Sequence, residues 1–270
     1  MRMVNTSILV VAALAAAGTV AWLLMRSQPA PIPATPSVTS DAPTLSARSP
    51  PPSATRYPIE KAAGETVVEP TEPLPTLDAS DGPIVAAASK VVRGDDIERL
   101  FNPKDFARRI VATVDNLPRS RVPPKIMALR SATGPLLVKP GEGEFALDPR
   151  NAERYARYVD FFTKVDLGRA VGVYVHFYPL LQQAYRELGY PEGHFNDRLI
   201  AAIDDLLAAP TPSSLVHLAQ PHVLYTFADP DLEARSAGQK IMLRMGPDNA
   251  QRVKVRLREL RKRLTGLPRS

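Results

Sequence analysis

Apolar residues in the C-terminal two-thirds of the chain recur at the spacing of α-helices. The clearest run covers residues 167–188, where the intervals alternate between four and three, so that the side chains share one helical face. These positions are Leu167, Val171, Tyr174, Tyr178, Leu181, Tyr185 and Leu188. Pro179 removes one backbone hydrogen bond within this run at a cost of about 3 kcal/mol, so we expect a kink or a break there. Gly189 is expected to end the helix.

Other segments combine the same period with residues that begin and end helices. We expect further helices over residues 102–118, 148–165, 195–207, 229–246 and 247–264. Asn102 before Pro103, and Asp148 before Pro149, are typical of helix N-termini. Gly238 would let another helix approach closely.

Short apolar stretches beside turn residues predict a small sheet. Residues 125–130, 135–138 and 145–147 flank the turn sequence "KPGEGE", and residues 215–218 and 222–227 are candidate edges. The predicted fold class is therefore mainly α. We expect a compact multi-helix domain over residues 81–265 with a minor antiparallel β-hairpin or sheet, followed by a tail at 266–270.

The N-terminal region has a different pattern. Residues 8–25 are eighteen uncharged, mostly apolar residues, which as a helix would span about 27 Å, close to the hydrocarbon thickness of a bilayer. A cleaved signal peptide is the alternative. We expect a retained transmembrane anchor, because the apolar run continues to Met25 and is followed at once by Arg26. The charges flanking it are nearly balanced, and we expect residues 1–7 in the cytoplasm and the rest exported.

Between the anchor and the domain, composition predicts a disordered tether over residues 26–80. Twelve of the 28 prolines lie at positions 29–75, among alanine, serine and threonine and few large apolar residues. Such a segment buries too little apolar surface to offset its conformational entropy. A semi-extended tether would hold the domain away from the bilayer.

Charge and cysteine content exclude several classes of site. The absence of cysteine removes disulfides, thiolate catalysis and cysteine metal ligands. The net charge of +6 resides in the C-terminal residues 251–270, which carry eight basic residues and one acidic residue. A basic surface is expected on the last helix, at Arg252, Lys254, Arg256, Arg258, Arg261, Lys262 and Arg263. It is either a solvated face of a docked helix or a contact for anionic headgroups or an acidic partner.

Long motifs in the chain resemble one known family. "PLPTLDASD", "RRIVATVDNLPR", "FYPLLQQAYRELGYPEGHFNDRL" and "FADPDLEARSAGQKIMLRMGPDNAQRVKVRLREL" are similar to the bacterial domain of unknown function 3014 family, from about Tyr57 to Leu260. The resemblance implies a Gram-negative envelope protein with an N-terminal membrane anchor. It implies no reaction, no cofactor and no catalytic residues.

The densest group of candidate functional side chains lies in "YRELGYPEGHFNDRL". Its candidate binding residues are Tyr185, Tyr190, His194, Asp197 and Arg198. They form either a ligand site or a polar seam between two helices, where a helix N-terminus favours polar side chains and a carboxylate. Helical spacing favours core packing over a sugar-stacking platform for the tyrosine stripe.

Motifs for catalysis are missing from the sequence. No HExxH metal motif, G-x-S-x-G nucleophile motif or glycine-rich phosphate loop is present. We expect no catalytic residue, metal or cofactor. A glycosidase remains an alternative, with paired carboxylates such as Glu187 and Asp197. Its chemistry depends on the distance between the two carboxyl groups, which a sequence does not give.

Together these observations predict a single-pass protein of the bacterial inner membrane with its C-terminal domain in the periplasm. The expected function is a non-enzymatic binding or scaffold module. Its expected partners are the membrane and another envelope protein or cell-wall component, not nucleic acid. The alternative is a cell-wall-directed hydrolase with a site near residues 185–198.

Overall fold

The structure is a computed structural model that describes residues 56, 57, 59, 73–92, 94–140, 145–221 and 223–266, without the side chains of residues 94 and 95. Within these ranges, no helix has both the length and the apolar character needed to cross a bilayer. The expected anchor at residues 8–25 lies outside the described residues, as does most of the expected tether.

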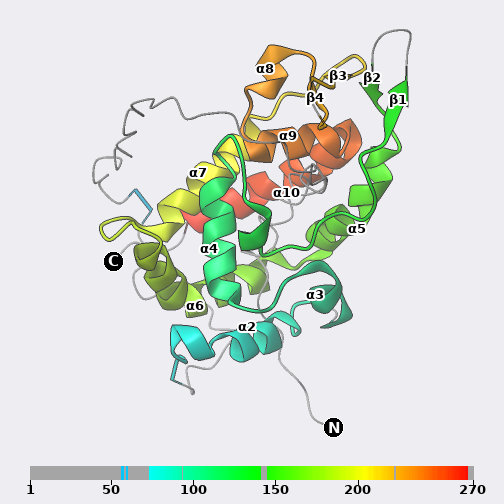
Figure 1. Ribbon diagram of the computed structural model, residues 1–270. Coiled ribbons are helices and arrows are strands. Elements are labelled where there is room, and N and C mark those ends of the chain that lie inside the picture. Colours follow the sequence, from blue (N-terminus) through cyan, green and yellow to red (C-terminus); the bar gives the residue numbers. More distant parts are fainter. Residues whose placement is uncertain are drawn as a thin grey trace, which may run out of the picture.

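Helices make up most of the described chain, as the periodicity predicted (Figure 1). The α-helices are α2 (Asp81–Ala88), α3 (Gly94–Leu100), α4 (Phe106–Asn116), α5 (Asn151–Lys164), α6 (Leu167–Glu187), α7 (Phe195–Leu207), α8 (Pro230–Glu233), α9 (Ala237–Arg244) and α10 (Pro247–Thr265). Two 3-10 turns, η2 (Leu77–Ala79) and η3 (Pro124–Ile126), complete the helical elements of the described part.

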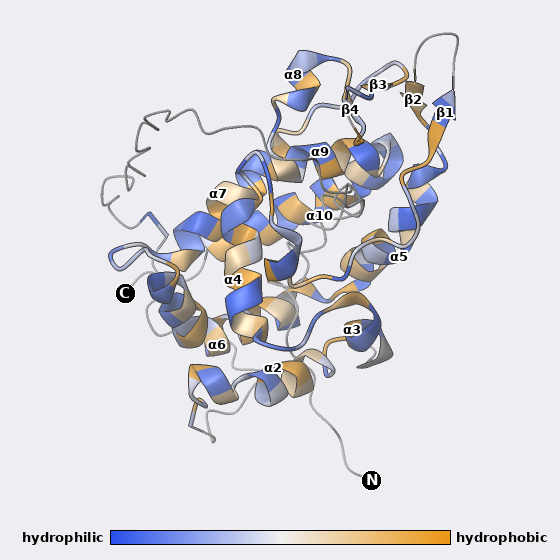
Figure 2. Ribbon diagram, in the orientation of Figure 1, coloured by the Kyte–Doolittle hydropathy of each residue, from blue (hydrophilic) through white to orange (hydrophobic). Residues whose placement is uncertain are grey.

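The core lies where α4 packs against α6 and α7, and where α10 packs against α5 and α7. Apolar faces of these helices turn toward one another (Figure 2). Tyr155, Phe106 and Phe195 are among its largest fully buried side chains, and each contributes about 1.5–3 kcal/mol by leaving water. The last helix buries Val253, Leu257, Leu260 and Leu264, as its spacing predicted. The packed helices thus form a frame that fixes the ends of α4, α6 and α7 relative to one another.

A four-stranded antiparallel sheet covers one end of this frame (Figure 1). Its strands follow the chain order: β1 (Val138–Pro140), β2 (Phe145–Leu147), β3 (His217–Ala219) and β4 (Thr226–Phe227). Val138 pairs with Leu147 across the first hairpin, and Phe145 pairs with Leu218 across the next. The expected hairpin around "KPGEGE" and both expected edges are confirmed.

One predicted strand is wrong. Residues 125–130 contain η3 and a single bridge between Phe101 and Leu129. Pro123 and Pro124 precede this segment and cannot donate to a ladder. The backbone of this segment bonds Asn102 instead. The amide nitrogen of Asn102 donates to the carbonyl of Ala128, and its side chain donates to the carbonyl oxygens of Met127 and Leu129.

Asn102 is therefore not the N-cap of α4, and the expected start of this helix is wrong. The helix begins at Phe106, after Asp105 in the left-handed conformation with φ 54°. Its first amides are satisfied from another element: the Asp81 carboxylate accepts from the nitrogens of Asp105 at 2.8 Å and Phe106 at 2.7 Å. The cap was missed because it comes from a residue 25 positions away.

The single helix expected over residues 229–246 is two helices, α8 and α9. Ser236 separates them, because its hydroxyl accepts from the amide of Gln239 and begins a new helix. Gly238 then lies where an added Cβ would be 2.7 Å from a methyl carbon of Leu206, so the predicted close approach is confirmed.

Helix α6 runs through Pro179 without a break. Its buried face on both sides of the proline includes Tyr174, Tyr178, Leu181 and Tyr185. Tertiary packing of this face therefore offsets the lost backbone hydrogen bond. The helix ends as predicted, with Gly189 following at φ 114°.

Candidate functional site

The candidate binding residues lie around the turn that joins α6 to α7, and the structure brings most of them together. Tyr185 near the end of α6 stacks on Tyr190 of the turn, with ring centroids 4.6 Å apart and planes 15° from parallel. Burial raises the pKa of Tyr185 to about 12, so its hydroxyl stays neutral near pH 7. An added Cβ on Gly193 would lie 2.9 Å from the Tyr185 ring, so the turn needs glycine there to form this stack.

Gln182 fixes the path of the turn. Its side-chain nitrogen donates to the carbonyl of Gly193 at 2.7 Å, and its oxygen accepts from the amide of Phe195 at 2.9 Å. The hydroxyl of Tyr178 donates to the same oxygen at 2.9 Å. The buried polar face of α6 thus binds the start of α7, which explains why this stretch is rich in polar residues.

A buried carboxylate, Asp115 at the end of α4, gathers the charged members of the site. It is 3% exposed and accepts from Arg198 of α7 at 2.9 Å and from Arg119 at 2.7 Å. Arg198 also donates to the Asp115 carbonyl, and the Tyr190 hydroxyl bonds the carboxylate at 3.3 Å and accepts from Arg119 at 2.6 Å. Two guanidinium groups around one buried carboxylate hold α4, the turn and α7 together.

Asp197 in the first turn of α7 has a different partner. Its carboxylate accepts from the backbone nitrogens of Arg56 at 3.0 Å and Tyr57 at 2.9 Å, about 140 residues earlier. The neighbouring Asn196 donates to the carbonyl of Tyr57 at 2.8 Å and accepts from the hydroxyl of Tyr174 at 3.0 Å. We call Arg56 and Tyr57 the docking segment. It lies inside the range expected to be tether and is bound to the start of α7.

His194 stands apart from these networks. It occupies the N-cap position of α7 without a side-chain capping bond, and its partly exposed ring makes no hydrogen bond to any described residue. Glu187, which the sequence paired with Asp197 as a possible glycosidase couple, is engaged by Arg108 at 3.2 Å. Across the described residues, no three His, Asp or Glu side chains are grouped so as to hold a metal ion.

The site extends along α7 to Asp205, which sequence reasoning missed. Ser236 donates to its carboxylate at 2.6 Å and Gln239 at 2.9 Å. Burial nevertheless raises the pKa of the Asp205 carboxyl. Ser236 is held as the N-cap of α9 by this contact, so its hydroxyl has a structural partner on each side.

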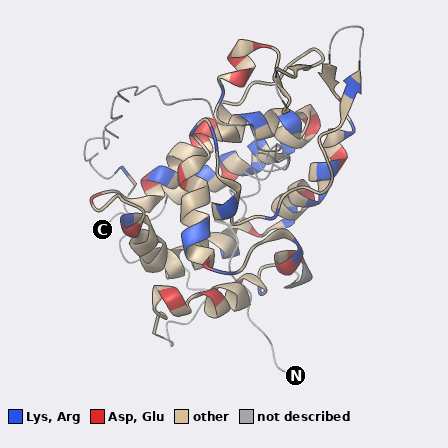
Figure 3. Cartoon of the chain, viewed as in Figure 1, with Lys and Arg blue, Asp and Glu red and all other residues tan. Residues whose placement is uncertain are grey.

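Acidic and basic residues are interspersed along the helices (Figure 3), and the basic residues of α10 are mostly engaged within the fold. Arg252 pairs with Asp160 and Arg261 with Asp204, both at 2.6 Å. Arg256 and Arg263 pair with Glu259, and the buried Lys254 ammonium donates to the carbonyl of Ala209. Arg258 and Lys262 remain exposed and form no ion pair with a described residue. Most of the expected basic surface is thus engaged: Arg252, Lys254 and Arg261 bond other elements, whereas Arg263 pairs within α10.

The residues that sequence reasoning missed share one signal. Asp115, and the last residue of α9, Arg244, whose surroundings are described below, are charged residues among buried apolar neighbours on helices. Charged side chains are seldom fully buried unless paired, so a charge on an apolar helical face indicates a special contact. The tyrosine stripe was interpreted correctly as core, since Tyr174, Tyr178 and Tyr185 are all buried.

Comparison with known proteins gives one match. A family described as "Protein of unknown function (DUF3014)" matches residues 106–261, more than half of the chain. No curated protein and no solved structure matches the chain. The matched range contains α4, α7 and α9, whose side chains build the network around Asp115 and Asp205.

Proposed function

The chain belongs to the DUF3014 family of unknown function, and we propose that it is a single-pass envelope protein whose helical domain is a periplasmic binding or scaffold module. The uncharged run at residues 8–25 supports the anchor, and the proline-rich composition of residues 26–55 supports a tether. The tether would present this module to another envelope protein or a cell-wall component.

The observation that carries this proposal is the docking segment on α7. The side chains that most resembled a reactive site, Asp197 and its neighbour Asn196, hold the backbone of the chain that enters the domain. Arg198 and Tyr190 are committed to Asp115 in the same region. These contacts would fix the point at which the tether joins the domain. A scaffold that holds its partner at a set place needs such a fixed point.

Cross-linking in intact membranes tests the function. We expect the tagged chain to capture a specific envelope partner, and the variant His194→Ala to capture the same partner with equal yield. His194 is the matched site for this purpose, because its ring bonds no described residue and its loss leaves the network around Asp115 intact.

The hydrolase alternative makes the opposite prediction. A cell-wall hydrolase would release fragments from purified peptidoglycan, and His194→Ala or Asp197→Asn would abolish this release while circular dichroism showed a normal fold. Such a result would replace the scaffold proposal.

A reporter fusion tests the topology separately. Alkaline phosphatase fused after Ser270 should be active in the full chain and inactive when residues 1–26 are deleted. Activity of a cytosolic fluorescent reporter at the same position, with no phosphatase activity, would contradict export.

A further inference from the structure

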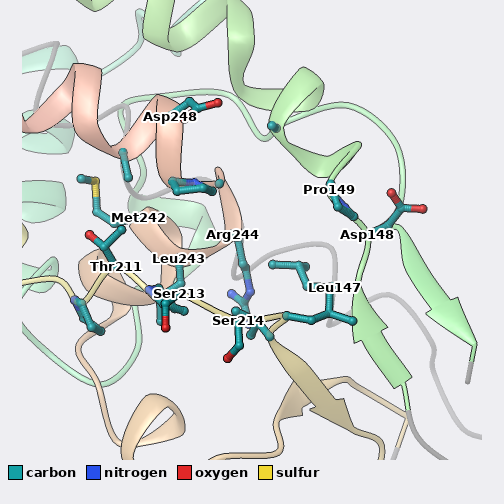
Figure 4. A pocket seen from close by; sticks show the side chains of 18 residues that line it. Leu147, Asp148, Pro149, Thr211, Ser213, Ser214, Met242, Leu243, Arg244 and Asp248 are labelled. Carbon is teal, nitrogen blue, oxygen red and sulfur yellow. The ribbon is translucent and has the colours of Figure 1, made fainter.

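A pocket lies where α9 meets α10, apart from the candidate residues of the α6–α7 turn (Figure 4). Its volume is about 410 Å³, within the range of roughly 300–1,000 Å³ that is usual for small-ligand sites. Its walls are the loop at residues 210–216, the start of α5 at Pro149 and Ala152, Leu147 of β2, and the first turn of α10.

Arg244, the last residue of α9, is the unusual member of this lining. Its side chain is 7% exposed, yet its guanidinium forms no hydrogen bond or salt bridge with any described residue, and its Nε is fully buried without a partner. In Figure 4 it extends from the helix toward Ser214 and Leu147. Its one aromatic contact in the described part is with Phe227, whose ring centroid lies 5.2 Å from the guanidinium carbon.

A buried cation without an anion is costly, so its retention needs an explanation. Burial lowers the pKa of Arg244 from its ordinary value, but arginine remains protonated under physiological conditions. Most buried charges have a counter-ion in the fold, as Asp115 does. In the described part of the chain no carboxylate forms an ion pair with Arg244, and Glu233, which acts on it electrostatically, pairs with Lys240.

The groups around Arg244 are suited to a negative charge. Hydroxyls of Thr211, Ser213 and Ser214 line the pocket and make no hydrogen bond to a described residue. The 19-residue helix α10 begins at the pocket after Gly246, with no side-chain capping bond. The dipole of α10 favours an anion at this end, although Pro247 itself has no amide hydrogen to donate.

The charge balance favours one negative charge over two. Two carboxylates also line the pocket: Asp148, which is neutralised by Arg150 at 2.7 Å, and the exposed Asp248. Arg244 is the only cation among the lining residues. A dianionic phosphate would therefore exceed the positive charge available, whereas one carboxylate would match the guanidinium fork.

The remaining lining residues define the rest of the ligand. They are mainly apolar, including Leu147, Pro210, Pro212, Val216 and Met242. Leu215 stands at this lining with 49% of its surface exposed. An apolar body beside the anionic group would cover these surfaces.

A neighbouring pocket of about 340 Å³ also touches Arg244, and Arg121 and Lys240 line it as well. It contains the carboxylate of Glu233, which pairs with Lys240 at 2.6 Å and accepts from the amide of Phe227. Glu233 thus already supplies this pocket with a bound carboxylate, whereas neither carboxylate of the first pocket forms an ion pair with Arg244. The two pockets give a matched pair of sites for testing.

We propose that the pocket at the α9–α10 junction binds a carboxylate attached to an apolar body, with Arg244 as the residue that recognises the charge. The ligand would be either an acyl chain ending in a free acid or a peptide ending in apolar residues, since both present this chemistry. The site deepens the proposed binding function by naming a ligand class, and it can exist whether or not a macromolecular partner is found.

Binding to the purified full chain tests the proposal. The probes are octanoate and an N-acetylated Leu-Leu dipeptide with a free C-terminus, each compared with its neutral amide. At least one acid should bind in calorimetry and raise the midpoint of thermal unfolding, and its amide should bind about tenfold or more weakly, as loss of one charge-assisted contact implies. The acid that binds identifies the source.

Three variants locate the site. Arg244→Met should lose the preference for acid over amide, and Leu215→Trp should weaken binding by obstructing the pocket. Leu224→Trp, which lies on the neighbouring pocket, should bind as the wild type does. Arg244→Lys should recover only part of the affinity, because ammonium lacks the guanidinium fork.

Stability gives a readout that separates recognition from a structural role. Removing an unpaired buried charge should leave the unfolding midpoint of Arg244→Met unchanged or higher. A lower midpoint with an unchanged acid preference would make Arg244 structural and overturn the proposal. Equal binding of acid and amide, binding of inorganic phosphate as tight as that of the acids, or no binding of either acid at millimolar concentration would also overturn it.

Discussion

At the scale of single residues, burial decides which charges matter. Asp115 is enclosed and shared by two arginines that differ in exposure: the Arg198 side chain is 25% exposed and that of Arg119 is 49%. An ion pair near solvent contributes little, whereas removing one partner of a buried pair leaves a charge uncompensated. The two arginines therefore differ in energetic weight although both contact the same carboxylate.

This difference is measurable by chemical denaturation. Arg198→Met should lower the free energy of unfolding by about 2–3 kcal/mol, since Asp115 then keeps only its more exposed partner. Arg119→Met, the matched control, should cost about 1 kcal/mol or less. Equal losses for the two variants would contradict the central place of Arg198.

Asp148 predicts a dependence of stability on pH. Hydrogen bonds from Arg150 lower its pKa from 3.8 to about 2, so the folded state favours the ionised carboxylate. This contribution is complete well above pH 3.8 and is lost as pH falls through 3.8 toward 2. Asp148→Asn should therefore reduce the loss of stability between pH 5 and pH 2, measured by urea denaturation at each pH. An unchanged pH profile would refute this assignment.

At the scale of elements, glycine marks where the backbone comes close to a neighbour. Gly193 and Gly172 differ in the space that is available for a side chain. An added Cβ at Gly193 would lie 2.9 Å from the ring of Tyr185, whereas one at Gly172 inside α6 meets nothing within 4 Å.

Alanine at these two positions should have opposite effects. Gly193→Ala should destabilise the domain by about 1–3 kcal/mol, because the Tyr185–Tyr190 stack must shift. Gly172→Ala should stabilise it by about 0.5–1 kcal/mol through helix propensity. Thermal unfolding of both variants gives the comparison, and stabilisation by Gly193→Ala would show that the stack adapts freely.

Elements were predicted well where one helix face carries the signal and poorly where distant residues decide. The spacing in α6, the C-terminal glycine at position 189 and the apolar stripe of α10 follow from local sequence. The start of α4 does not, because Asp81 supplies its cap. The candidate site followed the same rule: Tyr190 and Arg198 were found in one stretch, but their partner Asp115 lies about 80 residues earlier. Arg244 was missed because a pocket is a property of several elements together.

At the scale of the whole molecule, the domain includes chain that precedes Asp81. Leu77 of η2 is buried in the core, and Tyr57 packs against it. The docking segment adds two backbone hydrogen bonds to the carboxylate of Asp197. The region predicted by composition to be tether therefore contributes to packing at both of these points.

Truncation should reveal this contribution. A chain that begins at residue 63 should unfold at a lower temperature than one that begins at residue 50, because it lacks the docking segment and its charge-assisted bonds, worth about 1–3 kcal/mol each. Asp197→Asn should destabilise the longer chain and have little effect on the shorter one. Equal effects in both chains would show that the segment does not stabilise the domain.

The docking segment also changes how far the domain can stand from a membrane. A polyproline chain extends about 3.1 Å per residue, so residues 26–80 fully extended would cover about 170 Å. In an anchored chain, attachment at Arg56 would leave residues 26–55, or about 93 Å, as the contour length between anchor and domain. For an anchored protein, release of the docking segment from Asp197, Asn196 and the core would then lengthen the permitted radius well beyond 100 Å. The same contact would set which layer of an envelope the domain could touch.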